Sequence, residues 1–178
     1  MSICIALLRG VNIVGRKMVP MSELRAMAEA ARLANARTLL QSGNLVFESA
    51  KSVSALEKLL EGKIEERLGL TTDVHVRTAY EWHAVVAANP FAKEAKNDPS
   101  HLLVHVMRAA PMREQLASLR RAIAGRERIE IDDRHAYIVY PDGVGGSKLT
   151  TALLDRHLGT RGTARNWNTV LKLAAMTG

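Results

Sequence analysis

Pro20-Met21-Ser22-Glu23 and Pro111-Met112-Arg113-Glu114 are the two stretches of sequence that decide the fold. A turn signal follows each proline at nearly the same distance, after 23 residues at Gly43 and after 22 residues at Asp133. A Leu-Gly pair typical of a helix end follows after 49 residues in the first case and 48 in the second. Equal spacing over two halves of a chain indicates an internal duplication.

The first half predicts the element order β-α-β-β-α-β. Strands are expected at residues 3–8, 37–41, 45–47 and 72–76, with Ser42-Gly43-Asn44 as a tight turn between the middle pair. One helix is expected to begin at Pro20 and another at about Ser52 with its stop at Gly69, and both repeat apolar residues every three or four positions. Ser54 and Glu57 have the spacing of a capping box.

The second half repeats this order, with strands expected at residues 102–107, 129–131 and 137–140 and helices at 111–124, 149–158 and 167–176. The prediction is an α+β fold of two tandem ferredoxin-like (α/β-plait) units with antiparallel sheets. Residues 1–77 form the first plait, residues 78–99 a helical linker, and residues 100–178 the second plait with a C-terminal helix.

Composition excludes several classes of protein. Of 178 residues, 47% are hydrophobic, and the longest apolar run, residues 3–8, is too short to cross a membrane. The single cysteine, Cys4, excludes a disulfide scaffold and favours a reducing compartment, so we expect a cytoplasmic protein.

The net charge of +7 comes from two short segments. Residues 21–142 are neutral, whereas residues 1–20 carry +3 and residues 143–178 carry +4. Each segment also contains a loop that the other half lacks, at residues 10–17 and 143–147. Loops longer than the fold requires are common places for function, so a local site is favoured over scattered surface charge.

Topology predicts the neighbours of these loops. Residues 10–17 are expected beside residues 41–44, and residues 143–148 beside residues 163–165, because each pair shares one end of its sheet. If the two plaits pack inverted, both loop sets form one basic cleft for a small anionic ligand, phosphorylated or nucleotide-like. The expected ligand-binding residues are Arg9, Gly10, Asn12, Lys17, Gln41, Ser42, Asn44, Ser147, Lys148, Arg165, Asn166, Trp167 and Asn168.

The glycine-rich segment at 143–150 follows a strand and precedes a helix, where main-chain N–H groups and Lys148 suit an anion. It is not a P-loop, because its serine precedes the lysine, and Ser147 is alternatively a helix N-cap. Arg165 suits a carboxylate or phosphate. Trp167 is alternatively a core residue, with Asn166 or Asn168 as the N-cap of the last helix.

Catalytic chemistry has no signature in the sequence. Ser42 lies outside a Gly-x-Ser-x-Gly elbow, and His101 and His105 lack a readable third metal ligand, so no metal site is expected. Catalytic residues, cofactor, enzymatic activity and oligomeric state stay open.

A nucleic-acid-binding module is the alternative function, because plaits and a basic pI often occur together. Residues 2–8 contain no aromatic side chain and the neighbouring strand offers only Phe47, so binding would depend on phosphate contacts. A small anionic ligand is therefore the favoured partner, and a membrane is not expected.

Five segments closely resemble a bacterial family, domain of unknown function 1697. They are Leu7-Leu8-Arg9-Gly10-Val11-Asn12, Gln41-Ser42-Gly43-Asn44, Asn89-Pro90-Phe91, Ser147-Lys148-Leu149-Thr150 and Thr163-Ala164-Arg165-Asn166-Trp167-Asn168-Thr169-Val170. The resemblance spans essentially the whole chain and implies two tandem ferredoxin-like plaits, with no activity attached. One departure is Ile13-Val14-Gly15, where the family usually has two adjacent glycines.

Overall fold

The computed structural model describes residues 1–13, 15 and 18–178. Within this part, the chain forms an α+β fold with two four-stranded antiparallel sheets and seven helices. It divides into two compact units, Met1–Ala84 with Leu173–Gly178 (unit 1) and Val85–Lys172 (unit 2). The expected site residue Lys17 lies outside the described residues.

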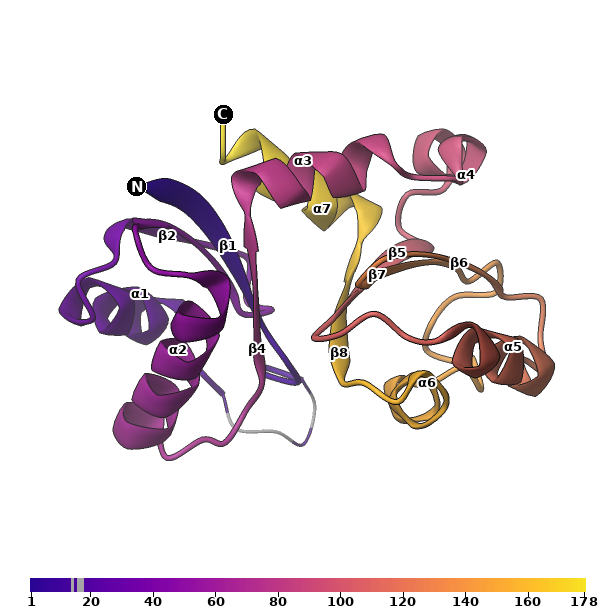
Figure 1. Ribbon diagram of the computed structural model, residues 1–178, viewed down its shortest axis with the longest axis horizontal. Helices are drawn as coiled ribbons and strands as arrows, with labels where there is room; N and C mark the ends of the chain where they lie inside the picture. The colour runs from indigo at the N-terminus through magenta and orange to yellow at the C-terminus, as the bar shows by residue number, and fades with distance from the viewer. Residues whose placement is uncertain (14, 16–17) are drawn as a thin grey trace. The chain divides into compact units, whose positions relative to one another are not determined.

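Unit 1, which carries the labels α1 and α2 in Figure 1, has the strand order β2-β3-β1-β4. Both helices cover one face of this sheet, where Leu24 and Leu60 pack with Ala6 and Phe47. The elements are β1 (Ser2–Leu8), α1 (Met21–Ala30), β2 (Ala34–Leu39), β3 (Asn44–Ser49), α2 (Val53–Leu68) and β4 (Val74–Thr78).

Two local expectations for unit 1 are wrong. The strand expected at 37–41 ends earlier, because Leu40 has a left-handed φ of 57° that an extended strand does not continue. The capping box is not formed either: Ser52 is the N-cap of α2 and its Oγ accepts from the Ala55 N–H at 3.4 Å. Glu57 is buried instead, and its Oε1 accepts from the Val76 N–H of β4 at 3.0 Å.

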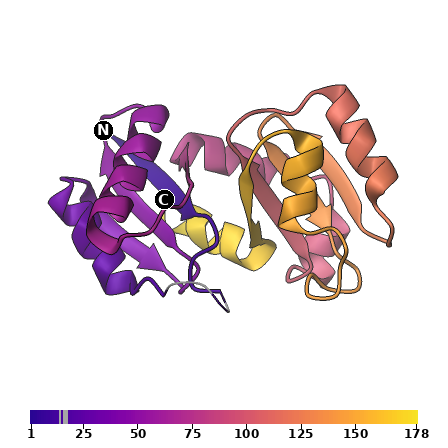
Figure 2. The same cartoon turned by 90° about the horizontal axis from the view of Figure 1, so that it is seen from below.

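Unit 2 has the strand order β6-β7-β5-β8. Figure 2 shows α5 and α6 over the same face of this sheet, where Leu119 and Leu154 pack with Met107 and Ile138. The elements are β5 (Leu102–Met107), α5 (Arg113–Ala122), β6 (Arg128–Asp132), β7 (His135–Val139), α6 (Thr151–Leu158) and β8 (Gly162–Asn166).

Three further helices complete the described fold. The segment expected as a helical linker contains α3 (Ala79–Ala87) and α4 (Ala92–Asn97), and α7 (Trp167–Ala175) follows β8. The chain after α7 is fastened to unit 1, where Arg37 Nη2 donates to the Met176 carbonyl at 2.7 Å. The Thr177 hydroxyl also lies 2.9 Å from His83 Nε2.

Each central strand is buried on both faces. Side chains alternate along a strand, so Ile5 and Leu7 point away from the helix-covered face that holds Ala6, yet both are fully buried. In unit 2, Val104 and Val106 are fully buried in β5. No helix in the described part of the chain is long and apolar enough to cross a membrane.

Candidate functional site

The loop after β1 lies against the β2–β3 hairpin. Asn12 Nδ2 donates to the Gln41 carbonyl at 2.6 Å, and the Leu8 N–H donates to the Gly43 carbonyl at 2.9 Å. Gly43 has a φ of +77°, and a Cβ there would lie 2.6 Å from Val11 Cγ2. For the described part of this loop, the expected proximity to residues 41–44 is confirmed.

Two of the expected site side chains in unit 1, those of Asn12 and Asn44, hold the loop and the hairpin in place. Asn12 Nδ2 also donates to the Val19 carbonyl at 2.8 Å, and Asn12 Oδ1 accepts from the Val19 N–H. Asn44 is fully buried, and its Nδ2 donates to the Leu39 carbonyl and to Ser42 Oγ, each at 2.8 Å. The side chain of Gln41 is exposed. These contacts fix the backbone of the loop and of the hairpin.

Arg9 and Gly10 begin the same loop. The Arg9 N–H donates to the Asp73 carbonyl at 3.0 Å, and the Arg9 carbonyl accepts from the Thr72 hydroxyl at 2.6 Å. Gly10 has a φ of +63°, and nothing lies within 4 Å of the position of a Cβ there. The backbone turns away from the sheet at Gly10, next to a half-buried Arg9.

In unit 2, residues 143–148, here called the glycine loop, connect β7 to α6. The N-cap of α6 is Thr150, whose Oγ1 accepts from the Leu153 N–H at 3.2 Å, so the alternative prediction of Ser147 as N-cap is wrong. Ser147 Oγ instead donates to the Glu127 carboxylate and accepts from the Leu149 N–H at 3.0 Å.

The glycine loop exposes main-chain hydrogen-bond donors. Its turn is closed by the Ser147 N–H, which donates to the Val144 carbonyl at 3.2 Å. Gly145 and Gly146, in the middle of the turn, have nothing within 4 Å of their Cβ positions. No described residue accepts a hydrogen bond from the N–H groups of Gly145, Gly146 or Lys148, and none pairs with the exposed Lys148 ammonium.

Arg165 lies in β8 and is only 7% exposed. Its Nη1 donates to Thr163 Oγ1 at 2.9 Å and to the Ala164 carbonyl at 2.8 Å, and burial lowers the pKa of its guanidinium to about 10. Arg77 is the fourth residue of β4, as Arg165 is of β8, and its Nη1 also donates to the preceding carbonyl, that of Val76, at 2.8 Å. A buried arginine at this position is therefore a feature of both units.

The residues after Arg165 begin α7. Asn166 Oδ1 accepts from the Thr169 N–H at 3.0 Å, and Trp167 is only 4% exposed. The alternative prediction, with Asn166 capping the last helix and Trp167 in the core, is thereby confirmed. Asn168 is exposed. Because β5 pairs with both β7 and β8, the glycine loop and the end of β8 leave the sheet at the same end.

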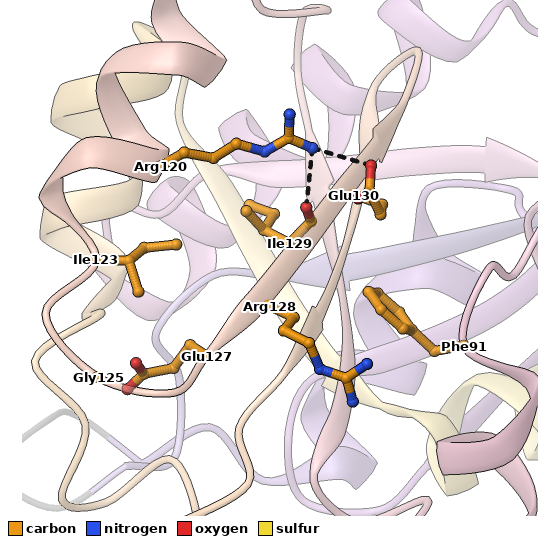
Figure 3. Close-up of a pocket in the computed structure, with 8 residues that line it drawn as sticks. All are labelled: Phe91, Arg120, Ile123, Gly125, Glu127, Arg128, Ile129 and Glu130. Carbon is orange, nitrogen blue, oxygen red and sulfur yellow. Dashed lines mark hydrogen bonds and ion pairs between the residues drawn. The ribbon is translucent and has the colours of Figure 1, made fainter.

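A pocket of about 530 Å³ lies along the free edge of β6 (Figure 3). Arg120 Nη2 donates to the Ile129 carbonyl at 3.2 Å and to Glu130 Oε2 at 3.0 Å. The Arg128 guanidinium lies over Phe91, 5.1 Å from the ring centre. The lining residues are Phe91, Arg120, Ile123, Gly125, Glu127, Arg128, Ile129 and Glu130.

Sequence reasoning missed this pocket, although Phe91 belongs to one of the motifs quoted above. The pocket is mixed in charge, since its two arginines face carboxylates. Arg128 pairs with Glu94 and holds the pKa of that carboxyl below its usual range. The pocket adjoins the glycine loop through the hydrogen bond from Ser147 to Glu127.

Within the described residues, no three His, Cys, Asp or Glu side chains gather in a way that could hold a metal ion. His101 precedes β5 rather than lying in it, so it does not share a strand face with His105.

Comparisons with known proteins place the chain in a family. The full chain is similar to the structure of the conserved bacterial protein SP0830 from Streptococcus pneumoniae, with a TM-score of 0.77, 18% identity and 99% of each chain covered. At this identity the likeness shows the fold alone. No match was found among curated proteins. The family model described as "Protein of unknown function (DUF1697)" matches residues 1–137, and the chain therefore belongs to this family.

Proposed function

We propose that the protein binds a small anionic ligand, phosphorylated or nucleotide-like, at the glycine loop. The observation that carries the proposal is the set of exposed N–H groups at Gly145, Gly146 and Lys148 in a segment, residues 143–154, that contains no acidic residue. Main-chain N–H groups near a cationic side chain bind oxyanions without burying a charge. The capped N-terminus of α6 begins three residues after Lys148 and adds a favourable dipole.

The fold proposal is that each unit is a ferredoxin-like plait and that the two are arranged in tandem. The element order β-α-β-β-α-β, a central β1 or β5, and two helices on one face of the sheet support it. In this fold, loops at the sheet ends change without disturbing the core, which suits the placement of the site on a loop expansion.

Within unit 1, the expected site residues are proposed to make ligand contacts of their own where the loop after β1 meets the β2–β3 hairpin. Gly10, Gln41 and Ser42 present backbone and side chains at the surface there, and Arg9 adds positive charge. Asn12 and Asn44 act by holding that backbone in place.

Nucleic acid is the competing ligand. The stacking mode of RNA-binding plaits has little support, because Phe47 packs among the helices of unit 1 and the other face of β1 is buried. Binding to nucleic acid would then depend on phosphate contacts alone and weaken steeply with salt.

Calorimetric titration with inorganic phosphate, a nucleoside monophosphate and a short single-stranded oligonucleotide tests the proposal. We expect phosphate and the nucleotide to bind, and Lys148→Ala to weaken both by about tenfold, the size of one lost charge-assisted hydrogen bond. Lys96→Ala, at an exposed lysine of α4, is the matched control. Binding of the oligonucleotide alone, with a steep salt dependence, would favour the nucleic-acid alternative, and no binding of any of the three would refute both.

A further inference from the structure

His101 lies next to the glycine loop with its ring held by a carboxylate. His101 Nδ1 is 2.8 Å from Asp98 Oδ2, and Ser100 Oγ donates to Asp98 Oδ1 at 3.2 Å. The His101 N–H also donates to the Asp98 carbonyl at 3.2 Å, closing a short turn. An ionised carboxylate only accepts hydrogen bonds, so the proton of a neutral His101 resides on Nδ1. Nε2 is then the atom available to a ligand.

Main-chain hydrogen bonds bring His101 close to the start of the loop. The Tyr140 N–H donates to the His101 carbonyl at 2.9 Å, and the Gly143 N–H donates to the Tyr140 carbonyl at 3.0 Å. His101 Nε2 lies 3.6 Å from the position that a Cβ of Gly143 would occupy. Because Gly143 has no side chain, no Cβ covers Nε2 at the first residue of the loop. The imidazole side chain is 40% exposed.

Among the described residues, both acidic and basic side chains lie near the ring. Asp98 is the carboxylate that touches it. Asp142, the neighbour of Gly143, is engaged by Arg126 Nε at 3.1 Å and forms an ion pair with that guanidinium. The Tyr140 hydroxyl points inward and donates to the Leu149 carbonyl at 3.1 Å. On the loop side, the charged groups are the cationic Lys148 and the carboxylate of Glu127, which accepts a hydrogen bond from Ser147 Oγ.

We propose that His101 is a binding residue of the glycine loop for a tetrahedral oxyanion, a phosphate monoester or its sulfate analogue, with Asp98 as its positioning residue. This inference rests on the proposed function and names a further contact and a regulation of the same site. When His101 is protonated, Nε2–H donates to the anion while Nδ1–H stays on Asp98. When it is neutral, the lone pair of Nε2 faces the anion instead, so binding weakens as the proton is lost.

The first test titrates sulfate into the protein at pH 5.5, 6.5, 7.5 and 8.5, with constant ionic strength. Sulfate stays a dianion over this range, whereas phosphate itself gains a proton near pH 6, so sulfate isolates the proton on the protein. We expect affinity to fall by about tenfold or more from the lowest to the highest pH, the loss of one charge-assisted hydrogen bond. His101→Gln is expected to bind weakly with no pH dependence. His157→Gln, at the half-buried histidine that contacts Ser118, is the control, and this variant is expected to keep the pH dependence of sulfate binding.

The second test uses nitrogen-15 NMR of the imidazoles. We expect the Nδ1–H form for neutral His101 without ligand, its loss in Asp98→Asn, and a shift of the Nε2 signal when sulfate is added at pH 6. Sulfate binding that depends on Lys148, with an unmoved His101 signal and no pH dependence, would overturn this inference and leave the proposed function intact. If neither sulfate nor phosphate binds at any of these pH values, the proposed function itself fails. An Asp98→Asn variant with unchanged tautomer and pH profile would remove Asp98 from its positioning role.

Discussion

The side-chain amide of Asn12 donates to the main-chain carbonyl of Gln41 at 2.6 Å, linking positions that are 29 residues apart in the chain. The same side chain binds both main-chain groups of Val19, so one residue closes its own loop and fastens it to the hairpin. Asn12 has a φ of 54°, a left-handed conformation that asparagine tolerates better than most residues.

Two substitutions at Asn12 separate the effect of its hydrogen bonds from that of its backbone conformation. Asn12→Gly keeps the backbone conformation and loses the hydrogen bonds, and we expect it to lower the free energy of unfolding by about 1–3 kcal/mol. Asn12→Ala adds backbone strain and should cost more. Urea denaturation measures both, with Ile13→Ala as the control at an exposed neighbouring side chain. Equal stability of Asn12→Gly and the parent protein would contradict the assignment.

Two glycine-to-alanine changes are expected to have opposite signs. At Gly43, a Cβ would lie 2.6 Å from Val11 Cγ2 and 2.9 Å from Leu8 Cβ, at a φ of +77°, so Gly43→Ala should destabilise by about 1–3 kcal/mol. At Gly62, inside α2, the same atom meets nothing within 4 Å, and Gly62→Ala should stabilise by about 0.5–1 kcal/mol. Thermal unfolding of the pair gives the comparison, and shifts of the same sign would contradict this account.

The start of α6 depends on Thr150. Removing its hydroxyl in Thr150→Ala leaves the Leu153 N–H without its cap, and we expect a loss of about 1 kcal/mol in unfolding free energy. Thr151→Ala, at the exposed first residue of the helix, is the matched control and should leave stability nearly unchanged. A larger loss in Thr151→Ala than in Thr150→Ala would place the cap elsewhere.

Stability should fall at alkaline pH because of a buried tyrosine. Burial, with a smaller contribution from the charge of Glu127, raises the pKa of Tyr140 to about 12. Below pH 10 the hydroxyl is protonated in both states, so the stabilisation is fully present. Between about pH 10 and 12 the unfolded chain releases the proton that the folded protein retains, and the free energy of unfolding falls by about 1–3 kcal/mol.

Denaturation curves between pH 9 and 11.5 test this dependence. Tyr140→Phe should reduce the alkaline decline without removing it, because burial also raises the pKa of Tyr137. Some stability is lost at neutral pH too, because the bond to the Leu149 carbonyl is removed. Tyr80→Phe, at a residue that is 86% exposed, should keep the decline of the parent protein. An unchanged slope in Tyr140→Phe would assign the decline to another group.

We expect the buried guanidinium groups of Arg165 and Arg77 both to contribute to the free energy of unfolding. Each guanidinium is buried and bonded to the backbone of its own strand, so Arg165→Ala and Arg77→Ala should each cost about 2 kcal/mol or more. Lys172→Ala, at an exposed residue of α7, should cost little. If Arg165→Ala leaves unfolding unchanged but weakens phosphate binding, Arg165 contacts the ligand rather than supporting the strand.

The sequence predicted the repeating frame better than its local details. Proline and glycine restrict or free the backbone by themselves, so they mark where helices begin and end. Pro20 directly precedes α1, and Gly69 and Gly159 directly follow α2 and α6, as expected. The capping box at Ser54 and Glu57 was mispredicted because Glu57 has a stronger partner, the β4 backbone, that no local pattern reveals. The strand expected at 37–41 is present as part of β2, but it ends at Leu39 because Leu40 has a left-handed φ.

For the candidate site, loop positions were predictable and side-chain roles were not. Gly10 and the glycine loop stand out as insertions when the two halves are aligned. That Asn12 and Asn44 hold the backbone, and that Trp167 is buried, depends on three-dimensional neighbours. Asp98 and His101 carry no motif at all, and their relation to Gly143 appears only when β5 and β7 pair.

The hydrogen bond from Arg37 to the Met176 carbonyl has a consequence for the order in which the protein matures during synthesis. Unit 1 includes Leu173–Gly178, so its last contacts form only after the segment that builds unit 2 has been translated. At about 5–20 residues per second, several seconds pass between the synthesis of Ala84 and that of Leu173, the two ends of the intervening segment. Until residues 173–178 have been synthesised, the surface of unit 1 that they contact lacks this covering segment.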